Sequence, residues 1–413
     1  MAIKPACPEK GRLFYGYIVV AASLVVMATM WGIYYSFGVF FKPLLDEFGW
    51  ARAVTSGVFS VSLIVVGFLC IVAGRLTDRF GPRLVVTVCG LFLGIGYILV
   101  SLVSSVWHLY LFYGVIISIG MSGAYVPLVS TVARWFVKKR GMMTGLAVSG
   151  LGLGTLIMPL VANWLISNHG WRFSFRVVGA VALVIVPLTA QLLRRDPGRM
   201  RQLPCGAGEL GEHHSSSRSG FSFREAILTK QFWMLSIAVI CFTITLGTVL
   251  VHVVPHAIGL RIHTTTAVGI LAIIGGVSIG GRVLMGSAYD RISNKLALTV
   301  CFVFLLVSTV LLLMAKDLKM LYLFATLFAL GYGGVSAIMS PTVAQLFGLA
   351  SHGAIMGTIN MFAESGSAIG SVLAGYIFDV TGSYRTSFLL CAVLSTIGLV
   401  LIRLVEPVSS AET

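Results

Sequence analysis

Residues 74–83 read Gly74-Arg-Leu-Thr-Asp78-Arg79-Phe-Gly-Pro-Arg83, and a related stretch, Gly286-Ser-Ala-Tyr-Asp290-Arg291, follows 212 residues later. Each stretch ends a long run of apolar residues. Three glycines recur at the same offset, since Gly141, Gly145 and Gly154 correspond to Gly353, Gly357 and Gly366. Several matches in one register indicate two halves of similar architecture, so the organisation of the first half predicts that of the second.

The composition indicates that most of the chain lies in a lipid bilayer. Of its 413 residues, 57% are hydrophobic and 10% are charged, whereas soluble domains carry about 25% charged residues. A bilayer core requires about 20 apolar residues in a helix, and the uncharged runs predict six such spans in each half. They cover 13–41, 53–74, 84–133 (two spans with a hinge near 104–108), 141–168, 177–193, 231–260, 262–289, 296–315, 320 to a break near 347–349, 353–378 and 386–402. We therefore predict an all-α membrane protein with 12 transmembrane helices in two pseudo-symmetric six-helix halves.

The distribution of charge predicts the topology. The formal net charge is +15, and a soluble basic chain of this kind would suggest nucleic-acid binding. Here, however, most of the Lys and Arg residues fall on the side of the spans that carries both termini, and positive charge marks cytoplasmic loops. We expect a multi-pass protein of the cell (inner) membrane with both termini in the cytoplasm and no nucleic-acid partner. The expected units are 1–193, a polar cytoplasmic linker at 194–230, and 231–413.

Two motifs resemble those of a known family. Residues 74–83 resemble the signature loop of the major facilitator superfamily, between its second and third spans. The stretch Arg134-Trp-Phe-Val-Lys-Lys-Arg-Gly-Met-Met-Thr-Gly145-Leu-Ala-Val-Ser-Gly150 is similar to a signature of proton-linked monocarboxylate transporters. Tyr15-Gly-Tyr17 and Phe40-Phe41-Lys42 also fit that family. We interpret the chain as a bacterial homologue of the proton-coupled monocarboxylate transporters of the lactate or pyruvate type, although bacterial oxalate/formate exchangers share much of this pattern.

Arg282 is the strongest single indication of a binding site. It lies eight residues before Asp290, about 12 Å inside the span at 1.5 Å per residue. An arginine within a span costs at least about 2.5–3.5 kcal/mol on insertion scales, which makes it a candidate functional residue. Its planar guanidinium can bind a carboxylate through two hydrogen bonds, and the resemblance implies the same role. The alternative is that the side chain extends to the cytoplasmic interface.

Glu364 is the only acidic residue well inside a span, about 16 Å from the start of its helix. Loss of hydration favours its protonated form, and a nearby guanidinium favours the carboxylate. We therefore expect Glu364 to carry the coupled proton, with a permanent structural ion pair or an interhelical hydrogen bond as the alternative.

The chain departs from both families in ways that bear on this expectation. Ser278 and Tyr35 stand where animal monocarboxylate transporters have an aspartate and a lysine, and Glu364 occurs in a helix where oxalate exchangers have a lysine. The first two differences argue against a proton relay of the kind found in the animal transporters. The third argues against a dianionic substrate, because one arginine beside an acid suits a monoanion.

The remaining candidates come from the spans that line the cavity in this superfamily. They offer aromatic and small polar side chains, and ligand sites are mostly apolar with a few placed polar groups. The expected substrate-binding residues are Met27, Trp31, Tyr35 (with Tyr34 as the alternative), Tyr125, Tyr332 and Asn360, besides Arg282. Each of these side chains can instead serve only helix packing.

The superfamily resemblance also implies a gate at the cytoplasmic helix ends. Asp78 would cap the eleventh helix and pair with a basic residue, for which we select Arg134, and Arg79 and Asp290 are the other gating candidates. The alternative is that these charges only mark the cytoplasmic side.

Together these features predict a carrier and no enzyme. The sequence contains no nucleophile–base pair, and His252 and His256 lack a third ligand at metal spacing. We expect no metal and no cofactor, and a protein that acts as a monomer. The predicted activity is symport of a small monocarboxylate with a proton by rocker-switch alternating access. The alternatives are a carboxylate exchanger of the oxalate/formate type and a carboxylate-binding membrane sensor that does not transport.

Overall fold

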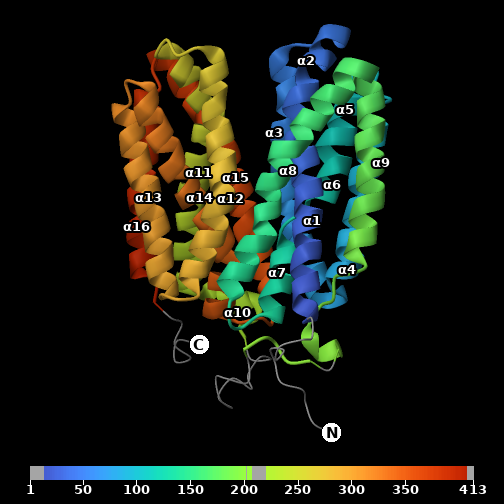
Figure 1. The fold of residues 1–413 in the computed structure, drawn as a ribbon, viewed down its shortest axis with the longest axis vertical. Coiled ribbons are helices and arrows are strands. Elements are labelled where there is room, and N and C mark those ends of the chain that lie inside the picture. The colour runs from blue at the N-terminus through green and yellow to red at the C-terminus, as the bar shows by residue number, and fades with distance from the viewer. Residues whose placement is uncertain (1–13, 201, 207–219, 407–413) are drawn as a thin grey trace.

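Two bundles of long α-helices stand side by side in the computed structural model, which describes residues 14–200, 202–206 and 220–406 (Figure 1). Residues 201 and 207–219 of the expected linker lie outside the described part. The helices of the first bundle are α1 (Tyr15–Tyr35), α2 (Phe37–Phe48), α3 (Arg52–Phe80), α4 (Pro82–Val100), α5 (Val106–Leu109), the π-helix η1 (Tyr110–Ile117), α6 (Ser118–Met121), α7 (Val126–Trp135), α8 (Arg140–His169) and α9 (Trp171–Ala190).

The second bundle has fewer interruptions. It contains α11 (Lys230–Gly259), α12 (Thr264–Tyr289), α13 (Asn294–Met314), α14 (Leu318–Phe347), α15 (His352–Thr381) and α16 (Arg385–Leu404). The short helices η2 (Pro197–Met200) and α10 (Phe223–Leu228) lie in the sequence between the bundles. Ser222 and Glu225 form a capping box that fixes the start of α10.

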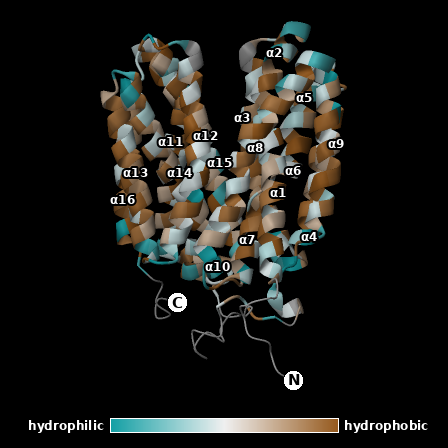
Figure 2. Cartoon of the chain, in the orientation of Figure 1, coloured by the Kyte–Doolittle hydropathy of each residue, from teal (hydrophilic) through white to brown (hydrophobic). Residues whose placement is uncertain are grey.

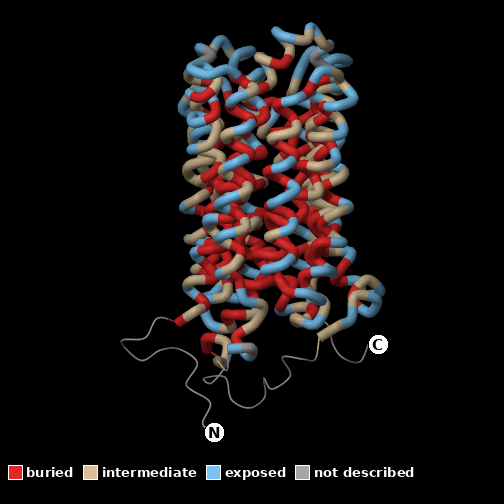
Figure 3. The backbone as a smooth tube through the Cα atoms, turned by 90° about the vertical axis from the view of Figure 1, so that its right-hand side faces the viewer, coloured by how far each residue is buried: buried red, intermediate tan, exposed pale blue. Residues whose placement is uncertain are grey.

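Eleven helices of the described chain are long and apolar enough to cross a membrane. Figure 2 shows the hydrophobic residues along the middle of the bundles and the hydrophilic ones mainly at their ends. The 30-residue helix α15 is not among the eleven, although it packs along α3 and α11. It carries Asn360 and Glu364, which lower its apolar character, and it occupies the inner side of its bundle. Figure 3 shows the buried residues concentrated in the interior of the molecule.

The fourth predicted span is broken in the structure. Helix α6 ends at Met121, and α7 begins only at Val126. Gly123 lies in this break, and a Cβ there would lie 2.6 Å from the Cβ of Cys89 on α4. The break therefore depends on a glycine that allows close approach, and it places Tyr125 at the N-cap of α7.

The bundles contact each other through two equivalent helix pairs, α3 with α15 and α8 with α12. Gly74 meets Gly353 in the first pair and Gly141 meets Gly286 in the second, with no room for a Cβ on either side. Small residues of this kind let helix backbones touch inside a membrane. Because all four glycines lie near one end of their helices, the bundles meet most closely at that end. Their ribbons diverge toward the other end (Figure 1).

Candidate functional site

A cavity of about 120 Å³ lies between the two bundles. A single water molecule requires roughly 10–15 Å³ on the same measure, so the cavity has room for a small organic molecule. Its walls come from α1, α8, α11, α14 and α15 and from Tyr125 at the break before α7. The lining residues are Trp31, Tyr35, Tyr125, Leu151, Val239, Phe242, Thr243, Leu246, Tyr332, Val335, Ser336, Met339, Met356, Ile359, Asn360, Ala363, Glu364 and Ser367.

Arg282 lies directly behind this cavity wall. Its side chain is 0% exposed, and one terminal nitrogen donates to Ser278 Oγ at 2.8 Å. The other donates to the Tyr332 hydroxyl at 3.0 Å, and the guanidinium carbon lies 5.0 Å from the centre of the Tyr332 ring. Its Nε has no hydrogen-bond partner. Among the described residues, this buried cation therefore has neutral hydrogen-bond partners, no carboxylate, and one nitrogen atom, Nε, without a hydrogen bond.

The Tyr332 hydroxyl connects Arg282 to the cavity. It accepts a hydrogen bond from Arg282, and its own proton is free to be donated to a group inside the cavity. Tyr35 and Glu364 line the same cavity as Tyr332. These four side chains come from both bundles, so the site exists only where the bundles meet.

Glu364 lines the cavity on α15, one helical turn after Asn360. It forms no ion pair with Arg282 in the described part of the chain, which argues against the permanent structural pair considered above. Asn360 Nδ2 donates to Cys70 Sγ at 3.3 Å, and a Cβ on Gly67 would lie 3.4 Å from the Cβ of Glu364. Glu364 is thus located at the α3–α15 contact between the bundles.

Six of the predicted site residues line the cavity, namely Trp31, Tyr35, Tyr125, Tyr332, Asn360 and Glu364. Arg282 does not line it and reaches it through Tyr332. Met27 does not line it either, because it is fully buried in the hydrophobic core. Tyr34 is also buried, and its hydroxyl donates to Ser62 Oγ.

Sequence reasoning missed the contribution of α11. Thr243 is a polar member of the cavity wall on this helix, and its hydroxyl donates to the carbonyl oxygens of Val239 and Ile240. A threonine within an apolar span was the available signal. The backbone carbonyl of Ser336 was not predicted either. It accepts from Tyr125 Oη at 2.8 Å and joins α14 to the N-cap of α7 across the two bundles.

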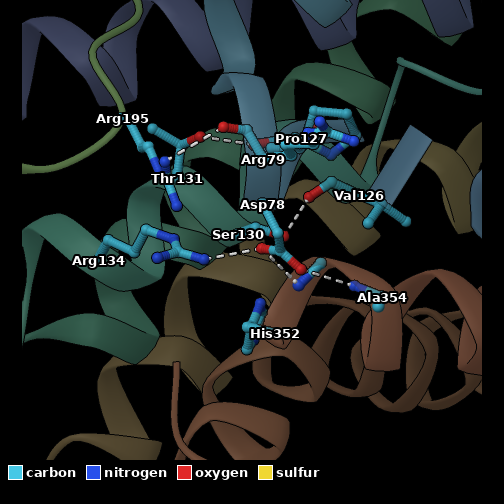
Figure 4. A network of polar contacts seen from close by, with 12 residues as sticks. Asp78, Arg79, Val126, Pro127, Ser130, Thr131, Arg134, Arg195, His352 and Ala354 are labelled. Carbon is cyan, nitrogen blue, oxygen red and sulfur yellow. Dashed lines mark hydrogen bonds and ion pairs between the residues drawn. The ribbon is translucent and has the colours of Figure 1, made fainter. Parts of the chain in front are cut away.

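A polar cluster surrounds Asp78 at the end where the bundles meet (Figure 4). Asp78 Oδ1 accepts from Arg134 at 2.8 Å and from the Gly353 N–H at 3.1 Å. Oδ2 accepts from the Ala354 N–H at 3.0 Å. Asp78 therefore caps the N-terminus of α15, where helix dipole and free N–H groups favour a negative charge. We name Asp78, Arg134 and the first turn of α15 the Asp78 latch.

His352 belongs to this latch and was not foreseen. Its ring is fully buried beside Asp78 (Figure 4). Nε2 contacts the Ser340 carbonyl at 3.1 Å, whereas Nδ1 has no partner. Arg79, in contrast, is exposed. Its guanidinium lies over the Phe80 ring, and its carbonyl accepts a hydrogen bond from Arg195. The structure therefore places Arg134, and not Arg79, against Asp78.

Asp290 occupies the equivalent place in the second half. Its two carboxylate oxygens accept from the N–H groups of Gly141 and Met142, both at 2.8 Å, and so cap α8. Burial raises the pKa of Asp290, and these two N–H groups and the nearby Arg140 oppose that rise. The part of the chain that the structure describes contains no cluster of three or more potential metal ligands.

Comparisons with known proteins agree with this architecture. The model of a family described as "Major Facilitator Superfamily" matches residues 20–318 and 279–413. Monocarboxylate transporter 13 of Bos taurus is 27% identical over 400 residues, which cover 96% of this chain and 90% of that protein. Monocarboxylate transporter 11 of Homo sapiens is 26% identical over 413 residues, covering 96% and 84%. Among solved structures, the proton:xylose symporter XylE bound to 6-bromo-6-deoxy-D-glucose superposes with a TM-score of 0.75 at 14% identity, covering 94% of each chain.

Proposed function

We propose that this chain, which belongs to the Major Facilitator Superfamily, is a secondary active transporter that moves a small monocarboxylate together with a proton. Its relatives are transporters and not enzymes. The monocarboxylate transporters among them span nearly its whole length. The observation that carries the proposal is the buried Arg282 with no carboxylate partner in the described chain, joined through Tyr332 to a cavity between the bundles.

A substrate carboxylate would supply the anion that Arg282 lacks. In the proposed complex, one carboxylate oxygen accepts the proton of the Tyr332 hydroxyl, and Arg282 strengthens this donor by hydrogen bonding to the same oxygen atom of Tyr332. Displacement of the Tyr332 ring would then allow direct contact with the guanidinium, including its free Nε. Trp31, Tyr35 and Phe242 would surround the apolar part of the substrate.

Glu364 is the proposed proton carrier. It is the acidic residue of the cavity wall and forms no ion pair with Arg282 in the described structure. An anion that enters alone moves against a negative interior at roughly 2.3 kcal/mol per charge per 100 mV. Co-transport of one proton removes this cost, and a single arginine opposite a single acid suits a monoanion of the lactate or pyruvate type.

The transport cycle would follow a rocker-switch mechanism. The Asp78 latch and the Asp290 cap hold the bundles together at one end, and the ribbons diverge at the other (Figure 1). We propose that the closed end is the cytoplasmic one, so that the structure represents an outward-facing state. Both termini would then lie in the cytoplasm and the protein in the cell (inner) membrane. Its interpretation as a bacterial protein stays an expectation, since the relatives named above are mammalian.

Uptake of radiolabelled lactate into proteoliposomes tests the proposal. We expect uptake by the wild type to increase when an inward proton gradient is imposed. Arg282→Gln should abolish it, and Arg291→Gln, which removes an exposed charge of the same type, should not. Absence of uptake for every monocarboxylate in competent vesicles would refute the carrier and favour the sensor. Uptake only into vesicles preloaded with a carboxylate would favour the exchanger.

A further inference from the structure

Another cavity, larger than the one between the bundles, lies on the outer side of the first bundle, where α4 begins and α9 ends. Its volume is about 690 Å³, and its lining includes Arg83, Thr87, Gln191, Arg194 and Arg195. We name this set of residues the α4–α9 groove. Figure 1 shows both helices on the side of the first bundle that faces away from the second. The groove is therefore separate from the cavity between the bundles.

The polar side of the groove is held in place by hydrogen bonds. Gln191 Oε1 accepts from Arg83 Nε at 2.6 Å, and Gln191 Nε2 donates to Thr87 Oγ1 at 3.2 Å. Arg195 donates to the Arg79 carbonyl at 3.4 Å and packs on Gly81. These contacts fix the base of the groove before any ligand binds.

The backbone that carries the other arginine is fixed as well. The carbonyl of Leu192 accepts from the Tyr15 hydroxyl at 2.9 Å, and the carbonyl of Arg194 accepts from the Trp135 indole at 2.8 Å. The segment after α9 is thus tied to the bundle core at two successive points. Arg194 extends from a positioned backbone and is exposed.

None of the three arginines forms an ion pair with a described residue. Arg83 and Arg195 donate to neutral oxygen atoms, those of the Gln191 amide and the Arg79 carbonyl. Asp196, the acidic residue nearest in sequence, does not line the groove. Three positive charges therefore converge on one groove whose described lining contains no carboxylate, an arrangement that suits a negatively charged ligand.

The surface that continues from the groove along the helices is apolar. Leu84 and Val88 on α4 and Leu188 on α9 are exposed, Leu84 to 54% and Leu188 to 65%, and Leu192 lies next to the groove arginines and is exposed to 45%. Figure 2 shows hydrophobic residues along the outer side of α9. In a membrane, these side chains face lipid tails, whereas the arginines lie at the level of the headgroups.

We propose that the α4–α9 groove binds an anionic phospholipid. The phosphate group would contact Arg83, Arg194 and Arg195, and the acyl chains would lie along the exposed leucines and valine of α4 and α9. A basic pocket between transmembrane helices at the membrane surface is a known kind of lipid site. A soluble phosphate would use the arginines alone and would leave the apolar surface without a role, which is why we assign a lipid.

Native mass spectrometry of the full-length protein in detergent tests this assignment. Phosphatidylglycerol is titrated against the wild type and against the combined variant Arg83→Gln, Arg194→Gln, Arg195→Gln. Each basic residue at an anionic membrane surface strengthens binding about fivefold. Loss of all three should therefore weaken phosphatidylglycerol binding about a hundredfold. The matched control replaces three exposed cations of the second half, Arg291, Lys295 and Arg403, by glutamine. It should bind phosphatidylglycerol as the wild type does.

Equal binding by the wild type and the groove variant would overturn the proposal. Two further arms test the ligand itself. Phosphatidylethanolamine should bind much more weakly than phosphatidylglycerol, and equal binding of the two would contradict the role of charge. Soluble glycerol 3-phosphate should not displace phosphatidylglycerol, and efficient displacement would assign the groove to a soluble anion instead.

Photochemical cross-linking provides a measurement that needs no variant. A phosphatidylglycerol with a photoreactive acyl chain is incorporated into vesicles with the wild-type protein. The label should be found mainly on peptides that include residues 84–95 or 184–192. A label distributed evenly over the lipid-facing helices of both bundles would contradict a specific site, even if the arginine variant failed to fold.

Discussion

Replacement of Arg282 by glutamine separates a binding role from a structural one. Arg282 is completely buried, donates to Ser278 and Tyr332, and has an Nε without a partner. A structural arginine in a membrane bundle is expected to have a carboxylate partner, as Arg134 has in Asp78. The contacts of Arg282 therefore predict that its loss affects ligand binding much more than folding.

The contacts of Arg282 set the expected changes in stability and in lactate affinity. The variant loses two hydrogen bonds from a charged donor, at about 1.5–3 kcal/mol each. It also removes a buried charge without a counter-ion, and burial of such an ion costs several kcal/mol. These contributions oppose each other, so stability should change by less than about 2 kcal/mol. Removing one partner of a buried charge pair costs about 2–5 kcal/mol of binding, which weakens lactate binding by roughly thirtyfold to several thousandfold.

Two measurements on purified protein in detergent test this difference. Thermal unfolding reports stability, and equilibrium binding of lactate reports affinity. Arg134→Gln is the comparison, because it leaves Asp78 without its arginine and should destabilise the protein by about 3 kcal/mol. A clear fall in the melting temperature of Arg282→Gln, combined with unchanged lactate affinity, would refute the reasoning and make Arg282 a structural residue.

Three further predictions concern the proton, the space around the guanidinium, and the latch. Glu364→Gln should retain substrate binding but lose the pH dependence of uptake, and an unchanged pH profile of initial rates would exclude it as the proton carrier. Gly152→Ala would place a Cβ 2.5 Å from Ile279 Cγ1 and 2.9 Å from an Arg282 terminal nitrogen, and overpacking against this part of α12 should weaken lactate binding about tenfold. Gly276→Ala, with nothing within 4 Å, is its control in the same binding assay. Asp78→Asn removes the latch ion pair and should open the closed end, seen as longer spin-label distances between the ends of α3 and α15; unchanged distances would contradict the latch.

The helical fold was predictable because it depends on apolar length, which a sequence displays directly. The break near 347–349 is confirmed, as α14 ends at Phe347 and Gly348 takes a positive φ of 75°. The break between α6 and α7 was not predicted, since residues 109–133 carry no charge to interrupt the run. The sequence features that mark this break are weaker than a charge would be. They are a serine–glycine pair at 122–123 and Pro127 in the first turn of α7.

The candidate binding site was predictable only in part, for a physical reason. Charge in lipid is expensive, so Arg282 and Glu364 stood out without knowledge of the fold. Tyr332, the partner that joins Arg282 to the cavity, is 50 residues away on another helix, and no periodicity links the two. Met27 was selected as a residue of the first span, one of those that line the cavity in this superfamily. It is fully buried in the hydrophobic core instead, on a helix against which α8 packs so closely that a Cβ on Gly154 would clash with the backbone of Ala28.

The repeat that organises the fold also shows where the two halves differ. Asp78 and Asp290 cap equivalent helices, but the residue that corresponds to Arg134 at the offset of 212 is Leu346. The Asp78 latch thus combines an ion pair with two backbone hydrogen bonds, whereas Asp290 has two backbone hydrogen bonds and only more distant positive charges. In the proposed rocker-switch cycle, opening of the closed end breaks both sets of contacts, and the ion pair makes the Asp78 contacts the more costly ones to break. We therefore expect the balance between the proposed outward-facing and inward-facing states to depend mainly on the Asp78 latch, so that a change in the environment of that one carboxylate shifts it.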